Sequence, residues 1–89
     1  MNTYIISYDL SDPGRDYSAL YAEIKSFDNW AHLMESCWCV RSGKDSKAIR
    51  DQVGRHTDKN DKLFVAKLTG QAAWEGLSED VSTWLHENL

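Results

Sequence analysis

An aspartate at the end of a short apolar strand is the residue best placed to do chemistry in this sequence. Residues 4–8 are mostly aromatic and β-branched with period-two alternation, which predicts a strand, and Asp9 stands at its C-terminal end. The cluster Ser-Asp-Pro-Gly at 11–14 ends that strand. A carboxylate at this position either binds a divalent metal ion or accepts hydrogen bonds from the backbone N–H groups of the following turn. The second role is the commoner one.

Basic side chains are the second group that points to a function. Lys47, Arg50 and Arg55 lie in a stretch with helical periodicity. Such residues either contact phosphate groups or form a solvated helix face, which is the more usual role of charges at this spacing. A net charge of −4, from 10 basic and 14 acidic residues, weighs against non-specific nucleic-acid binding. It leaves open a surface on which the charge is polarised.

Two cysteines flank a tryptophan in the run Cys37-Trp38-Cys39, which has the composition of a strand. Residues two apart on a strand share a face, with Cα atoms roughly 6.5–7 Å apart, which is the limit of disulfide reach. A zinc site would need two further ligands, and only His32 is an obvious candidate. We therefore expect two buried structural thiols.

The length of 89 residues predicts one domain, residues 1–89, that buries roughly 60–65% of its unfolded surface. No apolar run approaches the roughly 20 residues of a membrane helix, and no basic segment with a cleavage site begins the chain. No glycine-rich phosphate loop is present either. We expect a cytoplasmic protein that binds neither a membrane nor a nucleotide cofactor.

The remaining elements follow from periodicity and turn residues. The segment 30–40 is rich in residues that favour strands, but it is too long for one strand. We therefore expect two strands, divided near Glu35-Ser36 by a hairpin or a bulge. Asp16, Asp45 and Ser78 are predicted to cap three helices. The predicted elements are a strand at 4–10, a helix from Asp16 to Phe27, strands within 30–40, a helix from Asp45 to His56, a strand at 62–68 and a helix after Ser78.

The order βαββαβ, followed by one more helix, predicts an α+β ferredoxin-like fold with a four-stranded antiparallel sheet. In that fold the first two helices cover one face of the sheet. Alternation places Tyr4, Ile6 and Tyr8 on this face and leaves Ile5 and Asp9 on the other. An apolar residue on the open face implies a cover, which is either a second copy of the chain or the C-terminal helix.

Several segments resemble a known group of proteins. The first strand is similar to those of CRISPR-associated protein two and of the VapD-type toxin ribonucleases. A further likeness, covering nearly the whole chain, is to small bacterial and phage proteins of this superfamily that have no established function. The segments that carry the resemblance are Tyr8-Asp9-Leu10, Glu35-Ser36-Cys37-Trp38-Cys39-Val40, Asp61-Lys62-Leu63 and Trp84-Leu85-His86-Glu87-Asn88-Leu89.

The resemblance implies a homodimer in which Asp9 and its symmetry mate hold Mg²⁺ or Mn²⁺, which activates a water molecule against a phosphodiester. Ser11 and Asp12 would assist, and the protein would be an endonuclease or endoribonuclease. Nucleic acid would contact Arg15, Lys47, Arg50 and Arg55. The alternative is a non-catalytic dimeric module that binds nucleic acid or protein. The chain departs from the group at Cys37-Trp38, where Val-Phe is usual, and in the helix predicted where the group has a fifth strand.

Overall fold

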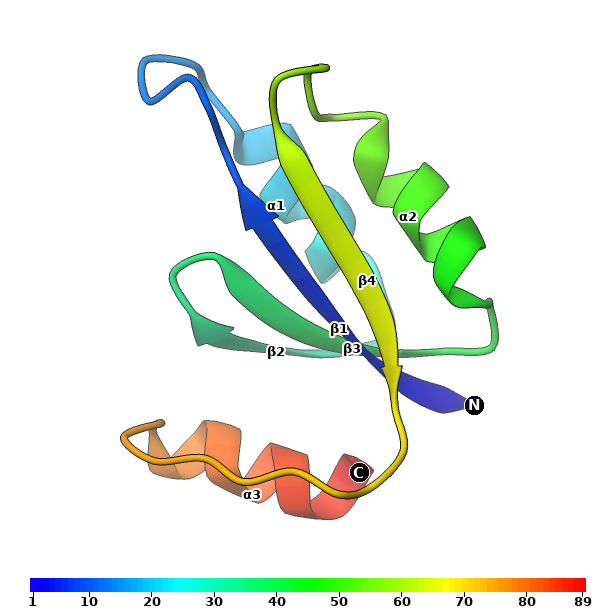
Figure 1. Cartoon of the computed structure of the whole chain (residues 1–89). Coiled ribbons are helices and arrows are strands. Elements are labelled where there is room, and N and C mark those ends of the chain that lie inside the picture. The colour runs from blue at the N-terminus through cyan, green and yellow to red at the C-terminus, as the bar shows by residue number, and fades with distance from the viewer.

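The computed structural model describes residues 1–89 and has the predicted α+β architecture. Four antiparallel strands form one sheet in the order β2-β3-β1-β4, with α1 and α2 on one face and α3 below the other (Figure 1). This arrangement is compatible with a ferredoxin-like fold extended by a C-terminal helix. The elements are β1 (Asn2–Asp9), α1 (Ser18–Lys25), β2 (Asn29–Met34), β3 (Cys37–Ser42), α2 (Ser46–Gly54), β4 (Lys62–Leu68) and α3 (Glu79–Asn88).

Strand β1 lies in the middle of the sheet, between β3 and β4. Its alternation is as predicted: Tyr4, Ile6 and Tyr8 are buried in the core under α1 and α2, whereas Asp9 is exposed. The cross-strand pairs Ile6↔Trp38 and Ile6↔Val65 fix the register on this face. The main core cluster consists of Tyr4, Ile6, Tyr8, Tyr17, Leu20, Ile24, Trp38, Val40, Ile49 and Val53.

The junction between β2 and β3 is both a hairpin and a bulge. Glu35 and Ser36 form the turn, and the register shifts between His32 and Met34. The backbone N–H of Tyr8 donates to the Ser36 carbonyl at 3.1 Å. No Gly or Asn is needed here, because the bulge supplies the extra twist that a tight turn would otherwise provide.

Two of the three predicted helix caps are confirmed. Asp45 accepts a hydrogen bond from the Ala48 N–H at 2.8 Å, and Ser78 accepts one from the Val81 N–H at 3.2 Å. The prediction for α1 was wrong at both ends: Tyr17 is the N-cap residue, and the helix ends at Lys25. Asp16 instead accepts a bond from the Ser18 N–H at 2.9 Å, in a turn before the helix.

Helix α3 covers part of the second face of the sheet, on which Ile5 lies. Of the two covers expected for this face, a second copy of the chain or the C-terminal helix, the structure contains the helix. Leu85 is buried, and so are the second-face residues Ala31 and Cys39. Trp84 donates from its indole Nε1 to the Asn29 side-chain oxygen at 2.6 Å, which fixes α3 against β2. The cover stops short of Phe64, which is 63% exposed. None of the helices is long and apolar enough to span a membrane.

Candidate functional site

Asp9 ends β1 on the part of the second face that α3 leaves open. Its side chain is 78% exposed and accepts no hydrogen bond, and the nearest cation is Lys62 Nζ at 4.0 Å. The two residues are cross-strand partners at the end of β1 and β4. A shallow hollow of about 190 Å³ surrounds them, lined by Ser7, Tyr8, Asp9, Lys62, Leu63 and Phe64. Asp9 is thus accessible and free to accept a ligand.

Asp61, and not Asp9, binds the turn that follows the first strand. Its Oδ1 accepts bonds from the Ser11 N–H at 2.8 Å, the Ser11 hydroxyl at 3.0 Å and the Tyr17 hydroxyl at 3.1 Å. Its Oδ2 accepts from the Asp58 N–H at 2.8 Å. The backbone N–H of Ser11, followed by that of Asp58, lowers the pKa of Asp61 to about 2. The role that the sequence left open for Asp9, as acceptor of turn N–H groups, therefore belongs to Asp61.

The low pKa of Asp61 predicts an acid-sensitive fold. A carboxyl with a native pKa of about 2, against an ordinary value of 3.8, stabilises the fold above pH 3.8. That contribution is lost as the pH falls from about 4 to about 2. In urea denaturation from pH 2 to pH 7, Asp61→Asn should be less stable than wild type at neutral pH and should lose less stability on acidification. Asp12→Asn is the control, and an unchanged pH profile in Asp61→Asn would contradict the prediction.

Ser11 and Asp12, expected to assist Asp9, are engaged within the loop. Ser11 donates both its N–H and its hydroxyl to Asp61. Asp12 Oδ1 accepts a bond from the Gly14 N–H at 3.1 Å. Neither side chain forms a hydrogen bond with Asp9.

The predicted nucleic-acid-binding side chains all form ion pairs with carboxylates. Arg15 pairs with Asp58, and this pairing raises the pKa of Arg15. Lys47 Nζ and Arg50 Nη2 both contact Asp51, at 2.9 and 2.8 Å. The Lys47 and Arg50 bonds lower the pKa of Asp51. The structure thus brings Lys47 and Arg50 together on α2, where the two cations share one carboxylate and one positive charge stays uncompensated.

Arg55 belongs to a network between α1 and α2 that is centred on Glu23. The Glu23 carboxylate accepts a bond from Gln52 Nε2 at 2.8 Å and one from Arg55 Nη2 at 2.9 Å, and lies 2.9 Å from His56 Nε2. The bonds from Gln52 and His56 lower the pKa of Glu23 to about 2. Arg55 is therefore part of the packing between two helices in addition to being exposed.

The two cysteines are free and buried on the second face, as expected. Burial raises the pKa of the Cys37 thiol, and it raises that of Cys39 to about 12. His32, the one candidate for a shared zinc site, stacks on Trp38 with ring centroids 3.8 Å apart. No three His, Cys, Asp or Glu side chains come together in a way that would hold a metal ion within one chain.

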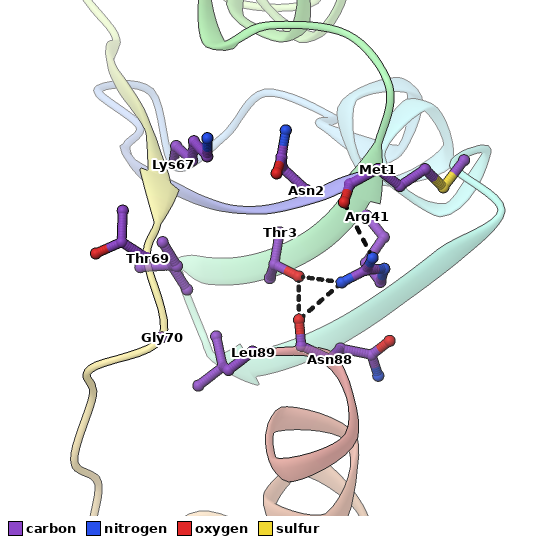
Figure 2. A pocket seen from close by; sticks show the side chains of 10 residues that line it. Met1, Asn2, Thr3, Arg41, Lys67, Thr69, Gly70, Asn88 and Leu89 are labelled. Carbon is purple, nitrogen blue, oxygen red and sulfur yellow. Dashed lines mark hydrogen bonds between the residues drawn. The ribbon is translucent and has the colours of Figure 1, made fainter.

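The largest hollow, about 450 Å³, lies at the opposite end of β1 from Asp9 (Figure 2). Arg41 projects into it and binds both ends of the chain, donating to the carbonyls of Asn88 at 2.8 Å and Met1 at 3.1 Å and to the Thr3 hydroxyl at 2.9 Å. The Thr3 hydroxyl in turn donates to the Asn88 carbonyl. Since every guanidinium bond goes to the chain itself, Arg41 anchors α3, and we assign it no ligand.

Sequence reasoning did not single out Glu23, Arg41 or Asp61 as organising residues. The sequence signal for Asp61 is its position in the polar turn before β4, within the segment Asp61-Lys62-Leu63. No protein-family model matches this chain.

Proposed function

We propose that this protein is a homodimeric, nuclease-like protein of ferredoxin fold, in which Asp9 carries metal-dependent hydrolysis of phosphodiesters in RNA or DNA. The observation that carries the proposal is the state of Asp9. At this end of the sheet Asp12, Asp58 and Asp61 are all occupied by donors of the chain, whereas Asp9 accepts none. A carboxylate kept exposed at a strand end, with only a long contact of 4.0 Å to Lys62 Nζ, is available to a cation.

One chain alone does not provide a metal site, because no three His, Cys, Asp or Glu side chains come together in it. Mg²⁺ and Mn²⁺ take several oxygen ligands, and a second copy would add a second carboxylate. Such an ion, when bound, polarises a phosphodiester and lowers the pKa of a bound water molecule. The role we assign to the chain is to hold two carboxylates where their mutual repulsion favours a cation.

The dimer itself is supported by the uncovered part of the second face. Phe64 is 63% exposed on a domain of only 89 residues. A large apolar side chain left in water on such a small domain favours association, since its burial contributes roughly 25 cal/mol per Å². Phe64 lies next to Asp9 in the same hollow, so a dimer whose two-fold axis passes beside Phe64 would bring the two aspartates near each other.

Replacing Asp9 by asparagine is expected to abolish cleavage. Labelled RNA, single-stranded DNA and duplex DNA are each incubated with Mg²⁺ or Mn²⁺, and wild type is compared with Asp9→Asn and with Asp12→Asn as the matched control. We expect cleavage of at least one substrate by wild type and Asp12→Asn, and none by Asp9→Asn. Sedimentation of wild type and Phe64→Glu tests the dimer. Cleavage that persists in Asp9→Asn would refute the assignment of Asp9.

A second candidate is a non-catalytic dimeric binding module. The observation that favours it is the pairing of Arg15, Lys47, Arg50 and Arg55 with carboxylates, which neutralises most of the positive charge expected to contact a nucleic-acid substrate. A dimer that cleaves none of the three substrates with either metal would refute the first function and leave the second.

A further inference from the structure

An apolar groove lies between α3, the segment that precedes it and the second face of the sheet. Its volume is about 330 Å³, within the range of sites that bind ligands or partner side chains. The floor is formed by residues from three strands, and the wall by residues 72–77 and α3. All but one of the lining residues are apolar: Ile5, Leu33, Met34, Leu68, Ala72, Ala73, Trp74, Leu77, Leu85 and Leu89, with Glu75 as the exception.

The wall of this groove is held in place by bonds within the C-terminal segment. The Trp74 indole Nε1 donates to the Ser82 hydroxyl at 3.1 Å, and its ring lies 5.0 Å from that of His86. Gly76 has a φ of 83°, a conformation that glycine adopts without strain, and it turns the chain back toward α3. The groove is therefore preformed, and a ligand would not have to open it.

The chain segment that forms the wall of the groove is acidic. The chain contains no lysine or arginine after Lys67, but it contains four acidic residues there, all exposed and none in an ion pair: Glu75, Glu79, Asp80 and Glu87. The other ten acidic residues are balanced by the ten basic ones, so this segment carries the entire net charge of −4. Glu75 lines the groove, and Glu79 begins α3 two residues after Leu77.

We propose that this groove binds a basic amphipathic segment of a partner protein. Apolar side chains spaced along one face of such a segment would fill the groove, and lysine or arginine side chains beside them would meet the unpaired carboxylates. Nucleic acid is disfavoured by the same charge. The proposal goes beyond the proposed function, since it concerns a protein partner and does not involve Asp9.

The probe is a synthetic peptide of about five helical turns with leucines on one face and lysines on the other. A peptide of the same pattern with glutamate in place of lysine is its control. Binding is measured by fluorescence anisotropy of the labelled peptides. We expect the basic peptide to bind wild type at least about tenfold more tightly than the acidic one, with a preference that weakens as salt is raised.

Three variants test whether the groove is the site. Ala73→Glu and Met34→Glu place a carboxylate on lining residues that are already exposed, so the fold should tolerate both. Each should weaken binding about tenfold or more, because burying an unpaired charge is costly. Phe64→Glu is the matched control, since Phe64 is equally exposed on the same face but does not line the groove. It should bind the peptide like wild type, and so should Asp9→Asn.

Two neutralised variants test the charge. Glu75→Gln combined with Glu79→Gln should reduce the preference for the basic peptide and flatten its salt dependence. Asp28→Asn combined with Asp12→Asn removes the same charge at two exposed residues that do not line the groove, and it should change neither. Equal binding of both peptides, or binding that Ala73→Glu leaves intact, would overturn the proposal. A wild-type dimer that Ala73→Glu dissociates would also overturn it, by assigning the groove to a second copy of the chain.

Discussion

Replacing Trp38 by alanine is expected to lower the free energy of unfolding by about 3–5 kcal/mol. Trp38 is 1% exposed and is the largest fully buried side chain of the core. Its ring lies 5.6 Å from that of Trp30 and 3.8 Å from that of His32. The indole Nε1 donates to the Tyr8 hydroxyl at 2.9 Å, so the truncation leaves both a cavity and a buried hydroxyl without its donor.

This loss is a large share of the stability of an 89-residue domain, which is of the order of 5–10 kcal/mol. Urea denaturation followed by circular dichroism measures it. Trp38→Phe should cost less than Trp38→Ala, since it keeps one packed ring, although it loses the bond to Tyr8 and leaves a smaller cavity. Trp30→Ala is the control, because Trp30 is 38% exposed, and its cost should be less than half that of Trp38→Ala. A Trp38→Ala variant within about 1 kcal/mol of wild type would contradict the assigned packing.

Replacing Leu85 by aspartate is expected to raise the reactivity of the two thiols by orders of magnitude. Leu85 is the buried residue of α3 and is 3% exposed, so a charge there should lift the helix from the sheet. Cys37 and Cys39 lie on the sheet face on this side and would be exposed. At pH 8 a thiol with a pKa of about 12 is thiolate in about one molecule in ten thousand, whereas an exposed cysteine is ionised in roughly a quarter.

The measurement is the rate of reaction with a disulfide reagent at pH 8 under native conditions. Thr83→Asp is the matched control, because Thr83 lies on the same helix and is exposed. It should label as slowly as wild type. Arg41→Ala should have a smaller effect in the same direction as Leu85→Asp, since it removes the bond from Arg41 to the Asn88 carbonyl at the end of α3. Equal rates in wild type and Leu85→Asp would show that α3 does not protect the cysteines.

The parts of the fold that were predicted correctly depend on short-range patterns. The alternation of Tyr4, Ile6 and Tyr8 is a property of consecutive residues, and it identified the buried face of β1. Asp45 and Ser78 act on N–H groups three residues away, within the range of a sequence pattern. Tyr17 is not a residue type that favours a helix N-cap, so the start of α1 was misplaced.

The organisation of the candidate site was less predictable, because it depends on residues far apart in the sequence. Ser11 and Asp61 are 50 residues apart, and Glu23 and Arg55 are 32 apart. Nothing in the local sequence of Arg55 indicates that it pairs with α1. The apolar groove is harder still to predict, because it exists only through the path that residues 70–77 take across the sheet. Its flanking charge, in contrast, is visible in the sequence as a segment with no basic residue.

The position of β1 in the sheet has a consequence for how the chain folds. The first strand is central, and its neighbours arrive late in the sequence, as the pairs Asn2↔Ser42 and Thr3↔Leu68 show. No strand beside β1 can therefore form from a local hairpin, and only the β2–β3 hairpin is local. Contacts between residues so far apart in the sequence form only after the chain between them has closed into a large loop. The entropy cost of loop closure comes before the stabilising contacts, and this slows folding. The domain should fold more slowly than a helical bundle of the same length.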